Sequence, residues 1–163
     1  MKPLADILSE SSVIVRETGQ WILQQSSQFS SSDIIYKGTN DLVSFVDQQA
    51  EAKLKEGLAQ IFPEAKFIAE ETSSNYEEVG DGYYWVIDPL DGTTNFLHKL
   101  PVFAVSVGLI YHKQPILGLI YEPNRDELFT ATKGNGAHLN GKPIQVSTEN
   151  SLSKSLLATG FPY

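Results

Sequence analysis

Acidic residues gather at four places in the sequence, each beside a turn or the end of an expected element: Asp47 with Glu51, Glu70 with Glu71, Asp88, and Asp91. The central stretch is WVIDPLDGTTNF, residues 85–96. Its apolar start predicts a strand that ends at Asp88. Pro89 fixes its own φ and predicts a turn, which brings Asp91 back toward Asp88. We therefore expect two carboxylates to point into one small volume.

A pair of converging carboxylates predicts a cation site. Two such groups repel each other, so they stay ionised only beside a cation, or one of them binds a proton. Donors that are all oxygen favour a hard ion, Mg²⁺ or alternatively Mn²⁺ or Ca²⁺, over zinc. Gly92 allows close approach of the backbone, and Thr93-Thr94-Asn95 predicts a helix start whose N–H groups suit a phosphate oxygen. Metal ligands and phosphate-binding amides in one short loop indicate phosphoryl-group chemistry.

Each of these features also has an ordinary structural explanation. Asp-Pro and Asp-Gly steps form turns in many proteins. Glu70-Glu71 alone is typical of a solvated acidic pair, and Asp47 with Glu51 of the polar face of a helix. The apolar strand before Asp88 and the helix opening after Asp91 favour a site over these explanations. The scattered histidines are expected to have no catalytic role: His98, His112 and His138.

Composition excludes several classes of protein. The 163 residues include 20 acidic and 12 basic side chains, for a net charge of −8, which argues against a broad nucleic-acid surface. The absence of cysteine excludes disulfides and zinc–thiolate sites. Asp6 and Glu10 interrupt the segment where a signal peptide needs an apolar core, and no apolar run approaches membrane-spanning length. We expect a cytoplasmic protein that binds neither membranes nor nucleic acid.

The elements that position these acids begin with two amphipathic helices. Apolar residues at helical spacing predict helices over residues 4–25 and about 44–61. Between them, residues 34–36 are consistent with a short strand, and turn-forming residues predict a loop over residues 37–41.

After residue 66 the period of the apolar residues changes from 3.6 to 2, which predicts strands. They are expected at residues 67–68, 83–87, 102–111, 115–121 and 127–132, with tight turns around residues 137–139. In residues 102–111 large apolar residues alternate with small ones, which suits a sheet covered on both faces. Two helices before a mostly antiparallel sheet predict an α+β fold, with residues 1–163 as a single metal-binding domain.

Further blocks accompany the central motif: GTNDLVS at 38–44, FIAEE at 67–71, PVFAVS at 101–106, GNGA at 134–137 and LATGF at 157–161. Together with DPLDGTTNF at 88–96, they resemble the inositol monophosphatase family of Mg²⁺-dependent, lithium-sensitive phosphatases. The match runs through most of the chain, although Ala69 replaces the glycine often found there.

The resemblance implies a role for each matching residue. Glu70 and Asp88, with the carbonyl of Leu90, look like ligands of a first metal ion. Asp88 also resembles a bridge to a second ion, which Asp91 helps to hold. The family uses two or three Mg²⁺ ions to activate water, with no phospho-enzyme.

The resemblance extends to the groups around the metals. Asp47 and Thr93 look like the pair that orients and deprotonates the attacking water, a step in which Glu70 is the alternative base. Gly92 and Thr94 are expected to contact phosphate through backbone and hydroxyl groups. Two further residues match the family's mobile loop near the metals: Lys37 and Asp41.

Family members carry a C-terminal half of comparable size, which completes the second metal site and contacts the sugar. The resemblance thus implies the N-terminal half of a layered αβαβα fold, poorly active alone. Homodimers are usual among relatives. The Thr-Thr-Asn-Phe motif at 93–96 resembles the inositol-phosphate branch, so inositol 1-phosphate is the expected substrate. Fructose 1,6-bisphosphate and 3′-phosphoadenosine phosphate stay open, as do a regulatory binding protein that retains the fold and a simple Ca²⁺-binding module.

Overall fold

The computed structural model describes residues 2–28, 39–69 and 80–158, and for residues 28 and 39–44 the backbone alone. Several predictions from the sequence lie outside these ranges: the short strand at 34–36, the loop residue Lys37, and the acidic pair Glu70-Glu71. Within them, no helix is both long and apolar enough to cross a membrane.

Two long helices precede the sheet, as the sequence predicts. α1 spans Leu4–Gln28 and α3 spans Thr39–Ile61. The prediction of a loop over residues 39–41 is wrong, because these residues, Asp41 included, form the first turn of α3. Thr, Asn and Asp favour helix N-termini as well as turns, since their short polar side chains bond nearby backbone N–H groups in both settings.

The described strands form one seven-stranded sheet in which neighbours in sequence are neighbours in space. β1 (Lys66–Ala69) pairs in parallel with β2 (Tyr83–Asp91). All other pairs are antiparallel: β3 (Ala104–Tyr111), β4 (Gln114–Glu122), β5 (Glu127–Thr132), β6 (Ala137–Leu139) and β7 (Lys142–Ile144). A short helix, α4 (Thr93–Leu97), follows β2, and a 3₁₀ turn, η1 (Leu152–Lys154), lies near the end of the chain. The predicted α+β fold with a mostly antiparallel sheet is confirmed.

Strand β7 was not predicted from the sequence, because it contains Pro143. Proline cannot donate a ladder hydrogen bond, so it indicates a turn unless the strand lies at an edge. β7 is such an edge strand: in the described sheet it pairs with β6 alone, and Pro143 stands opposite His138.

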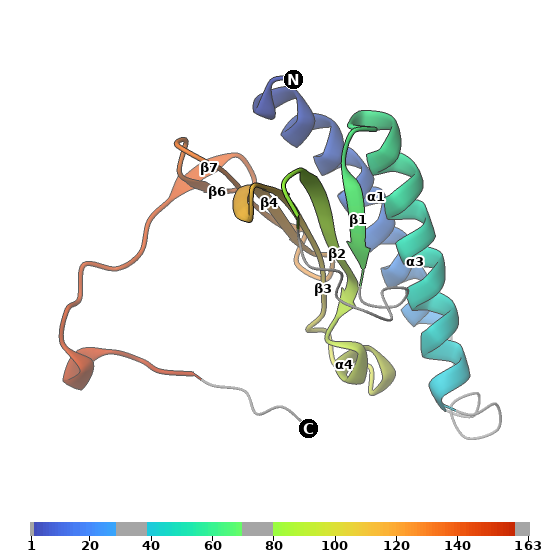
Figure 1. Cartoon of the computed structure of the whole chain (residues 1–163). Helices are drawn as coiled ribbons and strands as arrows, with labels where there is room; N and C mark the ends of the chain where they lie inside the picture. Colours follow the sequence, from blue (N-terminus) through green and yellow to red (C-terminus); the bar gives the residue numbers. More distant parts are fainter. Residues whose placement is uncertain (1, 29–38, 70–79, 159–163) are drawn as a thin grey trace.

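Both long helices lie on one face of the sheet (Figure 1). The core between the layers comes from inward-facing residues of the strands, such as Trp85, Val107 and Leu109, and from the apolar stripes of the helices. α1 sits close to β4, because a Cβ added at Gly19 would lie 2.5 Å from Cδ1 of Tyr121. Burial raises the pKa of the Tyr121 hydroxyl, which donates to Asp126 at 2.9 Å.

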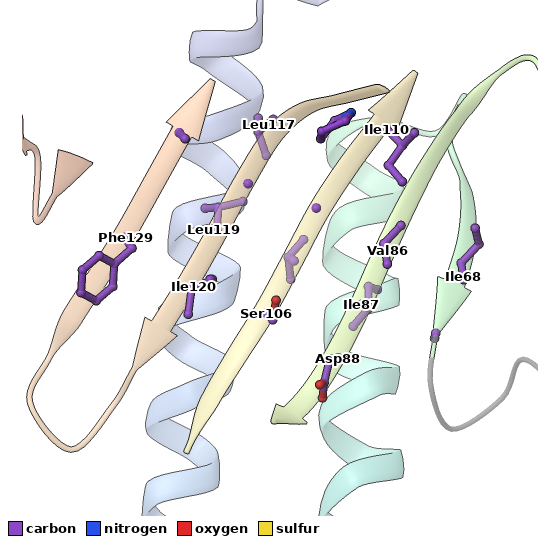
Figure 2. Close-up of a pocket in the computed structure, with 16 residues that line it drawn as sticks. Ile68, Val86, Ile87, Asp88, Ser106, Ile110, Leu117, Leu119, Ile120 and Phe129 are labelled. Carbon is purple, nitrogen blue, oxygen red and sulfur yellow. The ribbon is translucent and has the colours of Figure 1, made fainter. Parts of the chain in front are cut away.

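The second face of the sheet differs from the prediction. The sequence indicated a sheet covered on both faces, but none of the described helices covers the side that Ser106 and Gly108 occupy. We call this side the open face and define it by the residues Ile68, Val86, Asp88, Ser106, Gly108, Ile110, Gly118, Ile120, Phe129 and Ala131. Figure 2 shows several of these side chains on the strands, with the helices behind the sheet.

Candidate metal and phosphate site

The end of β2 has a different shape from the predicted turn. The strand does not stop at Asp88 but continues through Pro89 to Asp91. Its register against β3 shifts on the way: Asp88 stands opposite Ser106, whereas Asp91 stands opposite Ala104. Three steps on β2 thus match two steps on β3, which is the signature of a β-bulge with one extra residue.

The bulge puts both carboxylates on the same face. In a regular strand residues three apart point to opposite sides, because the side-chain period is two. Ala104 and Ser106 lie two apart on β3 and share a face, so their partners Asp91 and Asp88 share it too. Two residues along a strand correspond to about 7 Å. The register therefore puts both residues on one side of β2, through a bulge instead of the predicted turn.

Hydrogen bonds tie the residues of this strand end together. The backbone N–H of Leu90 donates to Oδ1 of Asp88 at 3.2 Å. The hydroxyl of Thr93 donates to the carbonyl oxygen of Leu90 at 3.0 Å. Asp88 is partly buried at the edge of the open face, whereas Asp91 is exposed. Four expected site residues thus lie at the end of β2 and the start of α4: Asp88, Leu90, Asp91 and Thr93.

Gly92 links the strand to α4 under two independent constraints. Its φ of 95° and ψ of 34° are left-handed, a conformation that glycine adopts without strain. A Cβ at this position would also lie 3.0 Å from the carbonyl oxygen of Val102 and 3.2 Å from Cα of Phe103. The Gly92 carbonyl then accepts from the N–H of Phe96 at 3.0 Å and starts the helix.

Replacing Gly92 with Ala is expected to displace the strand end from the start of β3. The new methyl group meets backbone atoms that cannot rotate away, and the left-handed φ adds strain of about 1 to 2 kcal/mol. We expect a loss of about 1 to 3 kcal/mol in the free energy of unfolding, measured by urea titration. Gly134→Ala is the matched control, since its φ is 87° and no atom lies within 4 Å of the added Cβ. An equal loss in both variants would contradict the close-approach argument.

Asp47 and Glu51 on α3 are both buried, with 4% and 3% of their surfaces exposed. The alternative of a solvated polar helix face is therefore wrong for this pair. Glu51 forms an ion pair with Nζ of Lys55, 2.7 Å from Oε1. This partner was missed in the sequence analysis, although Glu-to-Lys spacing of four residues is a recognised helical ion pair. Asp47 belongs to the helix layer, since α3 packs on β2 and contacts α4.

The remaining predicted site residues have different outcomes. Thr94 is exposed in α4. Asp41 lies in the first turn of α3, where only its backbone is described, and Lys37 and Glu70 lie outside the described residues. In the described ranges no three His, Cys, Asp or Glu side chains come close enough to hold a metal together. Two carboxylates and a backbone carbonyl at one strand end nevertheless fit Mg²⁺, which takes few protein ligands and keeps several waters.

Comparison with known proteins identifies the family. The model of the inositol monophosphatase family matches residues 5–163. Inositol monophosphatase 2 of Solanum lycopersicum is 49% identical over 135 residues, which cover 80% of this chain and 51% of the tomato protein. The fructose-1,6-bisphosphatase/inositol-1-monophosphatase of Aquifex aeolicus is 38% identical, over 99% of this chain and 61% of its own.

Solved structures agree with the fold. The extragenic suppressor protein suhB from Bartonella henselae superposes with a TM-score of 0.72 at 32% identity, over 90% of this chain and 55% of that one. The chain thus spans about half the length of the proteins that it matches. Since the family model extends over nearly all of the sequence, the chain belongs to the inositol monophosphatase family.

Proposed function

We propose that this chain supplies the Mg²⁺-binding part of a phosphate monoester hydrolase. The observation that carries the proposal is the bulge in β2, whose register puts Asp88 and Asp91 on one side of the strand. Leu90 lies between them in sequence, and its carbonyl accepts from the hydroxyl of Thr93. Carboxylate and carbonyl oxygens are the ligands that Mg²⁺ prefers. Family membership supports a phosphatase activity of this kind.

The proposal assigns the metal ligands first. Glu70, Asp88 and the Leu90 carbonyl would hold one ion, and Asp88 and Asp91 would hold a second, for two or three ions in all. Mg²⁺ held there would supply a water of lowered pKa and favour departure of the alkoxide.

The other proposed residues act on water and phosphate. Asp47 and Thr93 orient the attacking water, and Asp47 or Glu70 takes its proton. Gly92 and Thr94 contact the phosphate through backbone and hydroxyl groups. Lys37 and Asp41 close near the metals.

The negative charge of the proposed site supports a mechanism in which substrate binds only when metal is present. Four carboxylates, on Asp47, Glu70, Asp88 and Asp91, sum to −4 and repel a phosphate dianion. Two unit charges 4 Å apart interact by roughly 4 kcal/mol at an effective dielectric constant of about 20. Two or three Mg²⁺ ions reverse the sign of the site, so that an acidic protein binds an acidic substrate.

Inositol 1-phosphate is the proposed substrate, cleaved to myo-inositol and phosphate, and the name of the tomato relative supports it. Fructose 1,6-bisphosphate is the second candidate, because the Aquifex relative carries that activity in its name. 3′-Phosphoadenosine phosphate is the third. Cytoplasmic location, inhibition by lithium and a homodimer belong to the same proposal, and it includes neither membrane nor nucleic acid as a partner.

A regulatory binding role is the alternative from a different class, and the suppressor name of the Bartonella homologue favours testing it. Asp91→Asn separates the two. If hydrolysis is lost while the function in the cell persists, the regulatory role stands. If both are lost together, hydrolysis is the function.

The proposal is tested in a chimera that joins this chain to the part of the tomato protein beyond the matched stretch. We expect phosphate release from inositol 1-phosphate, loss of that release in EDTA, and its return with Mg²⁺. Fructose 1,6-bisphosphate and 3′-phosphoadenosine phosphate are assayed in parallel to rank the substrates. This chain alone is expected to bind Mg²⁺ but to turn over slowly. A folded chimera whose rate is unchanged by EDTA would refute the metal mechanism.

A further inference from the structure

The sequence contains two Asn-Gly steps, and neither has a role in the proposed function. Asn135-Gly136 lies between β5 and β6, and Asn140-Gly141 forms the turn between β6 and β7. Asparagine is chemically labile, above all before glycine, which has no Cβ to hinder attack by its own backbone nitrogen. Both asparagines are exposed, so only the restraints on their side chains can make the two steps react differently.

The side chain of Asn135 has few restraints. Its Nδ2 donates one hydrogen bond, to Oγ1 of Thr132 at 2.9 Å. Gly134 and Gly136 on either side have left-handed φ values of 87° and 72°, and a Cβ added at either would meet no atom within 4 Å. The N–H of Gly136 makes no hydrogen bond to any of the described residues. The Asn135 side chain therefore has room to rotate toward a backbone nitrogen that is not engaged.

The side chain of Asn140, in contrast, is held by both of its polar atoms. Its Oδ1 accepts from Nη2 of Arg16 at 2.7 Å and from the backbone N–H of Leu128 at 3.0 Å. Its Nδ2 donates to the backbone carbonyl of Asp126 at 2.8 Å. The backbone N–H of Asn140 also donates to the Leu128 carbonyl, at 2.8 Å. Rotation of this amide toward Gly141 therefore breaks three side-chain hydrogen bonds at once.

One of these restraints comes from helix α1, far from Asn140 in sequence. Arg16 is held in place by two further contacts. Its Nη1 pairs with a carboxylate oxygen of Asp126, and its guanidinium carbon lies 5.1 Å from the centroid of the Tyr121 ring. The hydrogen bond from Arg16 to Asn140 thus forms only when α1 is docked on the sheet.

We propose that Asn135 is a site of spontaneous deamidation in the folded protein, whereas hydrogen bonds to α1 and to the start of β5 protect Asn140. The backbone nitrogen of Gly136 gives up its proton and attacks Cγ of Asn135. A new N–Cγ bond forms, and the bond from Cγ to the side-chain nitrogen breaks. That nitrogen leaves as ammonia, which takes up a proton in place of the one lost by Gly136. Water then opens the succinimide ring at either carbonyl, which gives aspartate or isoaspartate.

The product changes the turn between β5 and β6 in charge and in length. A neutral amide becomes a carboxylate, so the net charge goes from −8 to −9. In isoaspartate the main chain runs through Cγ, which inserts an additional carbon before residue 136. The reaction does not depend on phosphate hydrolysis. Two strands, β3 and β4, separate β5 from β2, so Mg²⁺ binding at the end of β2 should not change.

The test follows both asparagines of the 163-residue chain during incubation in mildly alkaline buffer. Peptide mass spectrometry detects the exchange of an amide for a carboxyl group, and fragmentation between residues 135 and 140 assigns it. In the folded chain we expect Asn140 to react on the order of 100-fold more slowly than Asn135, because it must break more hydrogen bonds, one of them to a charged guanidinium. In urea the two steps should react at similar rates, which controls for their intrinsic chemistry.

Arg16→Ala tests the source of the protection. The variant removes one donor to Asn140, so this residue should deamidate about tenfold faster, with the rate at Asn135 unchanged. Arg125→Ala is the matched control: Arg125 is exposed, and it bonds to Glu122 through its backbone N–H. It should change neither rate.

The comparison of folded and unfolded wild-type chain stands even if Arg16→Ala fails to fold. Equal rates at the two asparagines in the folded chain would overturn the proposal. So would faster reaction at Asn140, or a rate at Asn140 that urea leaves unchanged. A folded Arg16→Ala chain in which Asn140 reacts as slowly as in wild type would contradict the protection by α1.

Discussion

Replacing Asp88 with Asn is expected to weaken Mg²⁺ binding by this chain on the order of 100-fold, because ligand charge sets the affinity of such sites. The substitution removes one negative charge and keeps the shape of the side chain. Its amide oxygen can still accept from the N–H of Leu90, so the bulge should persist. Binding is measured by titration with Mn²⁺, followed by electron paramagnetic resonance, with Mg²⁺ as the competitor.

The matched control for this experiment is Asp81→Asn. Asp81 carries the same charge, and its side chain is 85% exposed. It contacts Nδ1 of His112 at 3.2 Å, near the opposite end of β2. It should change the affinity less than twofold, because charges separated by more than about 8 Å in solvent are screened at physiological salt. Equal losses in the two variants would mean that net charge alone attracts the ion. Unchanged binding in Asp88→Asn would remove this residue from the site.

Leu109→Ala is expected to lower the free energy of unfolding by about 2 to 5 kcal/mol, the range for removing a buried leucine from a packed core. Leu109 has no exposed surface and faces the helix layer from the middle of β3. Shortening it leaves a cavity between the sheet and the helices that neither layer can close without moving. Urea unfolding followed by circular dichroism measures the change.

Ile110→Ala is the neighbouring control on the open face of the same strand. Its side chain is only half-buried, so the expected loss in the free energy of unfolding is about 1 kcal/mol. The two variants delete similar groups from adjacent positions and differ in the face that they occupy. If Ile110→Ala is as damaging as Leu109→Ala, then the open face is covered in this chain and the description of the fold is wrong.

The sequence predicted the bounds of an element well where the residues at its own ends mark where it starts and stops. Strand β5 has the predicted bounds, Glu127–Thr132, because a turn-forming stretch precedes it and its apolar residues alternate. The helices followed from their apolar spacing in the same way. The first turn of α3 was missed since residues such as Asn40 have the same local preferences at a turn and at a helix start.

The bulge at Asp88–Asp91, in contrast, could not be predicted from the local sequence. A proline after an aspartate indicates a turn locally, and only the pairing with Ser106 and Ala104 on β3 reveals that the strand continues with one residue inserted. The sequence therefore indicates that the two acids lie near each other, but not the backbone that puts them on one side of the strand. Periodicity likewise separates the two faces of β3 correctly, with Val107 on one and Gly108 on the other, yet it carries no information on what lies over either face.

The close packing of α1 against Tyr121 has a consequence for folding while the chain is being synthesised. α1 leaves the ribosome before the strands it packs on, but Gln20 donates to the Tyr121 hydroxyl across 101 residues of sequence. At about 5 to 20 residues per second, the apolar stripe of α1 waits on the order of 5 to 20 s before β4 exists to receive it. During that interval the nascent chain presents an unsatisfied amphipathic helix, the kind of segment that a ribosome-associated chaperone would shield.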